Sequence, residues 1–256
     1  MAVTPDKYQR VKITERKDYA EDLWSIRVQP EQPLSFKPGQ YATLGLERDG
    51  RVIEKPYSIV SSPLEAQIEF FFELEPQGEL TPPLYSLKVG ETALMRRQAK
   101  GLFTLDLKSG HKKHYLAATV TGVAPFVSMA RTQVREAEQG HPPDLKLVLL
   151  QAASRSWEFA YREELEALSK KYEWLHYIPT ISRPWEDPDW KGEVGRVEDV
   201  LRKYLDSQGL EPSETTAYLC GHPDMIENSK GILKRRGFPK ESIREEIYWV
   251  PAKKEK

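Results

Sequence analysis

The spacing of apolar residues changes near residue 110, and this change limits the folds open to the chain. Before it, short stretches alternate apolar and polar residues, as strands with one buried face do. Turn pairs such as Pro38-Gly39 and Val89-Gly90 separate them. About six closely spaced strands, with a single short helix expected around Pro82 to Leu87, predict an antiparallel sandwich or closed β-barrel.

After Gly110, apolar strand segments alternate with amphipathic helices. This order predicts an α/β domain with an open parallel five-stranded sheet covered on both faces. The polar, basic stretch Ser109 to Lys113 separates the two patterns, so we expect a two-domain protein with a β-barrel over residues 1–108 and the α/β domain over residues 109–256. The five expected strands are 115–118, 145–150, 175–181, 216–220 and 246–250.

Composition excludes several classes of function. A net charge of −1 argues against bulk electrostatic binding to nucleic acid or to a membrane surface. Met1 to Lys7 lack the apolar core of a signal peptide and no 18-residue apolar run exists, so a cytoplasmic protein is expected. One cysteine, Cys220, and five scattered histidines predict no disulfide, no metal site and no iron–sulfur cluster. Redox chemistry would therefore need an organic cofactor.

Two stretches of the first half combine polar groups with rigid backbone. In Lys55 to Pro63 the two prolines hold the chain extended, and a cation, an aromatic ring and three hydroxyls could line a planar, phosphate-bearing ligand. An edge strand with ordinary polar side chains is the alternative. Gly78 to Leu84 places a glycine turn and the Thr81 hydroxyl before a short helix, which predicts either an anion site or a structural cap of the barrel.

In the second half, the residues that follow each strand are candidate ligand contacts, because open parallel sheets bind ligands at that edge. The turn Thr119 to Phe126 opens a helix and suits a pyrophosphate, although a plain turn with Gly122 used for packing would look similar. Arg155 and Arg183 follow the next two strands and favour a 2′-phosphate, unless they are simply solvated. Cys220 is expected at the mouth of the sheet, or as a small buried hydrophobe.

Taken together, these stretches resemble the ferredoxin–NADP⁺ reductase family, in particular its bacterial members, over nearly the whole chain. The resemblance implies two cofactors, FAD and NADP. It implies that Tyr57 stacks on the isoalloxazine, that Ser58 hydrogen-bonds near its N5, and that Lys55 stands where the family has arginine. Ser58 and Cys220 are the catalytic positions that it implies.

The same resemblance assigns the remaining cofactor contacts. Trp249 falls in a terminal aromatic region that packs against the flavin or its adenine, although it could be an ordinary sheet residue. The other implied contacts are Gly78, Leu80 and Thr81 for the FAD pyrophosphate, Thr121 and Gly122 for the NADP loop, Arg155 and Arg183 for the 2′-phosphate, and Cys220 and Gly221 on the nicotinamide side.

Two positions depart from the family pattern. Lys55 keeps a positive charge but loses the planar two-pronged fork of arginine. Val120 replaces the first glycine of the NADP loop, where a β-branched side chain adopts positive φ only at a cost. Weakened NADP binding is the hypothesis that follows.

The implied activity is hydride transfer between NADPH and flavin N5, with single electrons passed to or from ferredoxin or flavodoxin on a separate chain. Two alternatives are an NADH-dependent flavin reductase and a flavin-binding regulatory or electron-transfer subunit. Basic side chains that could meet an acidic carrier, or simply be solvated, are Arg96, Arg97, Lys100, Lys112 and Lys113.

Overall fold

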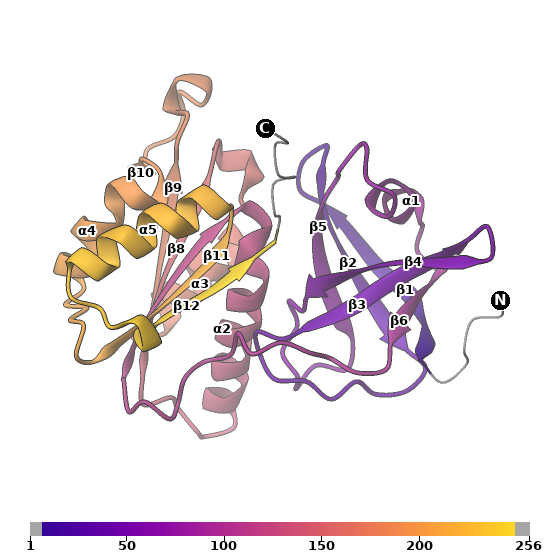
Figure 1. Cartoon of the computed structure of the whole chain (residues 1–256), viewed down its shortest axis with the longest axis horizontal. Helices are drawn as coiled ribbons and strands as arrows, with labels where there is room; N and C mark the ends of the chain where they lie inside the picture. The colour runs from indigo at the N-terminus through magenta and orange to yellow at the C-terminus, as the bar shows by residue number, and fades with distance from the viewer. Residues whose placement is uncertain (1–6, 249–256) are drawn as a thin grey trace, which may run out of the picture. The chain divides into compact units, whose positions relative to one another are not determined.

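Two sheets, one antiparallel and one parallel, form the framework of the computed structural model, which describes residues 7–248 (Figure 1). The chain divides into two units. The first runs to Leu105 and also takes in Ala124–Pro142; the second contains Asp106–Val123 and the chain from Pro143. Trp249 and residues 250–256 lie outside the described residues.

The first unit is built on a six-stranded antiparallel sheet in the order β4-β3-β6-β1-β2-β5. An isolated bridge between Ile59 and Phe70 joins the two ends of this order, so the sheet closes into the predicted barrel. The short helix α1 covers Thr81–Ser86, close to its predicted place. The strands are β1 (Tyr8–Asp18), β2 (Leu23–Pro30), β3 (Tyr41–Arg48), β4 (Arg51–Ser58), β5 (Ile68–Glu73) and β6 (Thr92–Arg96).

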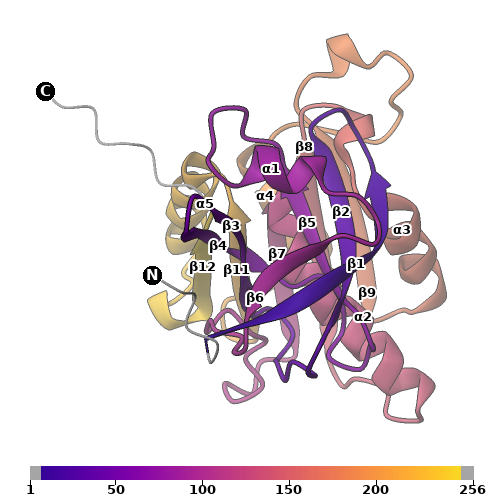
Figure 2. The ribbon, with the colours of Figure 1, turned by 90° about the vertical axis from the view of Figure 1, so that its right-hand side faces the viewer.

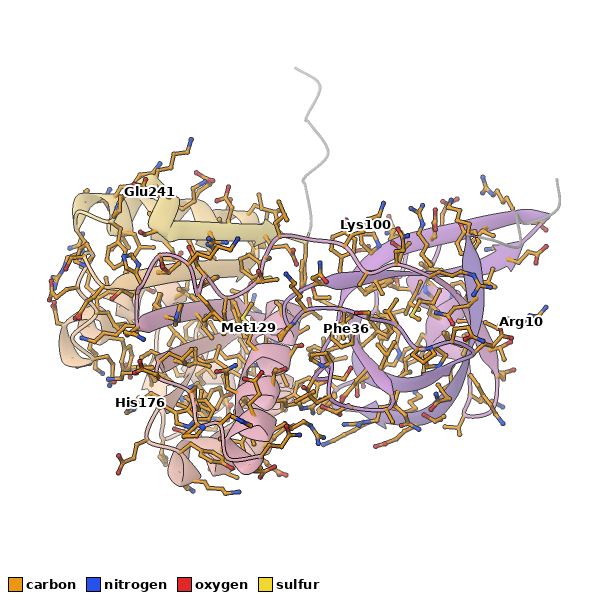
Figure 3. The ribbon with its side chains drawn as sticks, turned by 90° about the horizontal axis from the view of Figure 1, so that it is seen from below. Arg10, Phe36, Lys100, Met129, His176 and Glu241 are labelled. Atoms are coloured by element: carbon orange, nitrogen blue, oxygen red, sulfur yellow. The ribbon has the colours of Figure 1, made fainter. Side chains whose placement is uncertain are left out.

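Alternation along the strands fills the barrel. On β1, Val11 and Ile13 are fully buried, whereas Arg10 is exposed and points away from the barrel (Figure 3). β1, β2 and β5 lie side by side (Figure 2), and across the β2–β5 pair Trp24 stacks on Phe72 with ring centroids 5.1 Å apart. The period-two pattern of the sequence therefore corresponds to an apolar barrel interior.

Helix α2 (Ala124–Glu138) belongs to the first unit because polar groups attach it to the barrel. Ser128 Oγ donates to the carbonyl of Ser61 at 2.7 Å, and the hydroxyls of Thr132 and Ser62 lie 3.0 Å apart. Arg131 pairs with the buried carboxylate of Glu69 at 2.7 Å. The serines at the end of the Lys55 to Pro63 stretch thus hold a helix.

The second unit is built on a parallel sheet in the order β10-β9-β8-β7-β11-β12, which has six strands rather than the predicted five. The added strand, β10, has two residues, too few for a periodic pattern. β12 begins at Ile243 rather than at residue 246, because three charged residues of this edge strand conceal its start. The strands are β7 (Lys113–Thr119), β8 (Lys146–Ala153), β9 (Leu175–Ile181), β10 (Glu193–Val194), β11 (Thr215–Gly221) and β12 (Ile243–Ile247).

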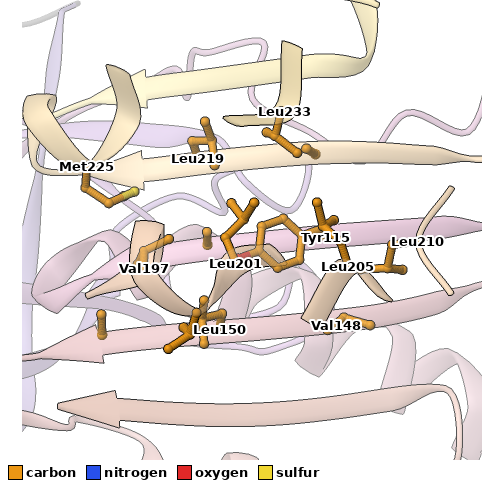
Figure 4. Close-up of a cluster of buried hydrophobic side chains, with 14 of the residues drawn as sticks. Tyr115, Val148, Leu150, Val197, Leu201, Leu205, Leu210, Leu219, Met225 and Leu233 are labelled. Carbon is orange, nitrogen blue, oxygen red and sulfur yellow. The ribbon is translucent and has the colours of Figure 1, made fainter. Parts of the chain in front are cut away.

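Helices cover both faces of this sheet (Figure 1). α4 (Val197–Ser207) and α5 (Pro223–Arg235) pack on one face, where Leu150 and Leu219 of the strands meet Leu201 of α4 (Figure 4). α3 (Arg162–Lys171) lies on the other face beside β9. Among residues 7–248, no helix is both long enough and apolar enough to cross a membrane.

His114, the second residue of β7, is a buried polar side chain of the second unit with one ring nitrogen that lacks a hydrogen-bond partner among the described residues. It is fully buried, and its Nε2 has no hydrogen-bond partner among the described residues. Nδ1 lies 3.3 Å from Tyr218 Oη, and the nearby charged or titratable groups are Asp106, His111 and Arg244. Burial lowers the pKa of His114 to about 4.

The low pKa predicts an acid sensitivity. Because the unfolded histidine titrates near 6.5, protons bind preferentially to the unfolded chain, and the free energy of unfolding should fall by about 3 kcal/mol as the pH drops from about 6.5 to about 4. Urea unfolding across this range measures the slope. His114→Gln should flatten it and the exposed-site variant His141→Gln should not; an unchanged slope in His114→Gln would contradict the assignment.

Candidate functional site

Strand β4 presents Lys55 and Tyr57 on one face and Ser58 on the other. Lys55 is exposed and makes no ion pair with the described residues, while Ser58 is buried. Tyr57 is half-buried with its ring edge-on to Phe72 at 4.8 Å. Burial raises the pKa of its hydroxyl, and Oη has no hydrogen-bond partner in the described part of the chain. A buried hydroxyl without a partner is costly, so a ligand that bonds it would be favoured.

The turn before α1 offers backbone groups rather than side chains to an anion. Thr81 Oγ1 accepts from the Glu75 N–H at 3.0 Å and donates to the Glu75 carbonyl at 3.2 Å, so this hydroxyl closes the loop that contains Gly78. The Leu80 side chain is fully buried in the barrel core. Pro82 and Pro83 have no N–H to donate. The N–H groups of residues 79–81 have no backbone acceptor among the described residues and remain available.

The switch point of the parallel sheet lies between β7 and β11. The chain passes from β7 to β8 and β9 on one side and then returns to the other side of β7 with β11. Ligands bind at the carboxyl ends of such a pair. There the His222 N–H donates to Thr119 Oγ1 at 2.8 Å, which couples the two strand ends. The sequence interpretation did not single out Thr119, and no spacing signal points to it.

The glycines at this edge allow very close packing. A Cβ on Gly122 would lie 2.3 Å from the Cys220 carbonyl oxygen. A Cβ on Gly221, whose φ is +125°, would lie 2.2 Å from Thr119 Oγ1. Both glycines are therefore required by the packing of the fold, which supports the packing role considered for Gly122. Thr121, in the same turn, is partly exposed.

Val120 adopts φ +42°, a left-handed conformation that is unfavourable for a β-branched residue. It begins the 3-10 turn Val120–Val123, which leads into α2. The side chain that departs from the family pattern thus occupies a position where glycine would have the lower backbone energy.

Cys220 is fully buried within β11, beside Ala118 of β7 and Glu246 of β12. Burial raises the pKa of the thiol, the Glu246 carboxylate raises it further, and a hydrogen bond with Tyr248 opposes them. The thiol is therefore neutral and is no thiolate nucleophile.

The two arginines that follow β8 and β9 meet at one carboxylate, Glu186. Arg155 Nε donates to Glu186 at 2.6 Å and Arg155 Nη1 pairs with Glu158 at 2.9 Å. Arg183 Nη1 lies 3.7 Å from Glu186, and its side chain is about half exposed. The hydrogen bonds that Arg155 donates to Glu158 and Glu186 raise the pKa of the arginine. Sequence reasoning missed Glu186, although the pentapeptide Ser-Arg-x-Trp-Glu occurs after both strands and could have indicated it.

Comparison with known proteins identifies the family. An oxidoreductase NAD-binding domain model matches residues 116–231. The fold is similar to that of a ferredoxin–NADP⁺ reductase from Neisseria gonorrhoeae with bound FAD and NADP, at a TM-score of 0.81 and 23% identity, covering 95% of this chain and 99% of that one.

No group of three or more metal-ligating side chains gathers within residues 7–248.

Curated relatives agree over most of the length. A ferredoxin–NADP reductase of Azotobacter vinelandii is 32% identical, and one of Pseudomonas aeruginosa is 30% identical; each alignment covers 85% of this chain and 86% of the relative. The chain belongs to the ferredoxin–NADP reductase family.

The conformation of Val120 leads to a stability prediction. Val120→Gly is expected to raise the free energy of unfolding by about 1 kcal/mol, because the relief of backbone strain exceeds the added entropy of the unfolded chain. Val120→Ala keeps a Cβ and should gain less. Urea titration of the three proteins tests this, and equal midpoints for the two variants would refute the strain.

Proposed function

We propose that this protein is a FAD-dependent oxidoreductase that exchanges electrons between NADPH and a carrier such as ferredoxin or flavodoxin. The observation that carries the proposal is the face of β4, where the buried Tyr57 hydroxyl has no partner among the described residues and the Lys55 cation forms no ion pair with them. Such a face suits a planar ring system that bears a phosphate. The names of the relatives point to the same activity.

The barrel residues fit a flavin dinucleotide. Tyr57 would supply an aromatic contact and a hydroxyl to hydrogen-bond, and Lys55 would supply charge to a phosphate. Leu80 and Thr81 would hold the pyrophosphate through the N–H groups of residues 79–81, since the Thr81 hydroxyl is occupied by Glu75. Gly78 would shape the turn, because its own N–H donates to the Glu75 carbonyl. Ser58 is buried and would act near the flavin ring rather than on its phosphates.

The second unit fits the nicotinamide nucleotide. Thr121, Gly122 and Gly221 would bring backbone close to the ligand, and Arg155 and Arg183 would meet a 2′-phosphate. When bound, the flavin supplies the exchange of one hydride for two single electrons. Cys220 would bound the nicotinamide site as a neutral, buried thiol that neither attacks nor transfers a proton near pH 7.

An electron carrier would meet the basic side chains that are not already paired. Arg96 pairs with Glu54, Lys112 with Asp144 and Lys113 with Glu214. Arg97 and Lys100 are exposed and make no ion pair with the described residues. Of the five basic positions, these two are the stronger candidates for contact with an acidic carrier.

One observation favours a second candidate, an NADH-dependent flavin reductase. Glu186 contacts both arginines that are proposed for a 2′-phosphate, and Arg155 also pairs with Glu158. Steady-state rates with NADPH and NADH distinguish the candidates, because a preference for NADPH is expected only if the phosphate displaces that carboxylate.

The principal experiment is a visible spectrum of the purified protein. A flavin spectrum, bleached by NADPH under anaerobic conditions and restored by an oxidised ferredoxin or flavodoxin, is expected. A colourless protein that FAD cannot reconstitute would overturn the proposal.

Tyr57→Phe tests the role of the unpartnered hydroxyl. We expect FAD to dissociate about fivefold more readily, while the unfolding free energy of the apoprotein stays equal or rises by about 1 kcal/mol, because a buried unsatisfied group has been removed. Tyr85→Phe is the matched control, since its hydroxyl donates to the Glu21 carbonyl at 3.2 Å and should leave FAD affinity unchanged. Fluorescence titration of FAD measures the affinity, and equal affinities of Tyr57→Phe and the unmodified protein would exclude the hydroxyl as a ligand contact.

A further inference from the structure

The pentapeptide Ser-Arg-x-Trp-Glu occurs twice, as Ser154 to Glu158 and as Ser182 to Glu186. Each copy follows a strand, β8 or β9, and the two strands pair in parallel register with Ala153 opposite Ile181. Each copy also contains a 3-10 turn, Ser156–Glu158 or Pro184–Glu186. The sheet therefore places two equivalent turns, each with an arginine and a glutamate, side by side.

The two glutamates have different partners. Glu158 accepts from the Ser154 N–H at 2.8 Å as well as from Arg155, so it stabilises its own turn. The Glu186 carboxylate instead contacts the guanidinium groups of Arg155 and Arg183, and no other hydrogen bond to it is present among the described residues. Its side chain therefore acts on the arginines and not on the backbone.

Other bonds hold the two turns together without Glu186. The buried Asp187 carboxylate accepts from the Ser156 N–H at 2.8 Å. The Arg183 N–H donates to the Ser154 carbonyl at 3.0 Å. Removing the charge of Glu186 should therefore leave the local backbone in place.

We propose that Glu186 is an internal competitor of the 2′-phosphate and thereby sets the preference between NADPH and NADH. The inference depends on the proposed role of Arg155 and Arg183. A carboxylate and a phosphate seek the same guanidinium donors, so a 2′-phosphate must displace Glu186 before it gains both arginines. A nucleotide with a free 2′-hydroxyl does not require these donors, so its binding does not include the free-energy cost of displacing Glu186. Glu186 acts through the arginines and is a positioning residue.

The test compares two probes that differ only in the 2′-phosphate, adenosine 2′,5′-bisphosphate and adenosine 5′-monophosphate. Calorimetric titration of the full chain should show Glu186→Gln binding the bisphosphate about fivefold more tightly, the effect expected for releasing a partly exposed ion pair, with the monophosphate unchanged. Glu163→Gln is the matched control. It removes the same charge from an exposed position in the first turn of α3 that forms no ion pair with the described residues, and should change neither affinity.

Three outcomes would overturn the proposal: unchanged bisphosphate affinity in Glu186→Gln, weaker bisphosphate affinity, or an equal gain for both probes. Arg155→Gln and Arg183→Gln separate this failure from that of the proposed function. If these variants weaken bisphosphate binding while Glu186→Gln has no effect, only the role of Glu186 fails. If they leave bisphosphate binding intact, the proposed 2′-phosphate contacts fail with it.

Discussion

The close approach of β7 and β11 at their carboxyl ends is the constraint on which the second unit depends. The Thr119 hydroxyl accepts a hydrogen bond from the His222 N–H, and neither Gly122 nor Gly221 has room for a side chain. This packing constrains the backbone of the turn that follows β7 even without a ligand. Within this turn Val120 adopts a positive φ. The backbone conformation of this turn is thus determined by strand packing, at the edge where open parallel sheets in general bind their ligands.

The ion pairs of the two units differ in burial. In the first, the buried Glu69 is compensated by Arg27 at 2.9 Å and Arg131 at 2.7 Å, which attaches α2 to the barrel. Removing one partner from such a group is costly, so these pairs serve the fold. In the second, the paired side chains of Arg155 and Glu186 are partly exposed. A pair of this kind contributes little to stability but can alter the affinity of a charged ligand.

Much of the architecture could be predicted because it depends on local periodicity. The alternating stretches at residues 23–28, 41–46 and 67–74 indicated the barrel, and the apolar strands around Leu150 and Leu219 indicated the parallel sheet. Strand β10 was not predicted because two residues show no periodic pattern. The start of β12 was not predicted because an edge strand tolerates charged residues. The assignment of Tyr57, Arg155 and the other site residues to cofactors remains a prediction.

The sequence by itself determined the order of the two sheets and which residues follow each strand, since hydrophobic period and turn residues are properties of neighbouring positions. Only the tertiary structure decided that Arg155 and Arg183 share the Glu186 carboxylate, that the Thr81 hydroxyl is already occupied, and that Cys220 is buried and neutral. These facts depend on contacts between distant segments and on burial from solvent. No spacing along the chain encodes them directly.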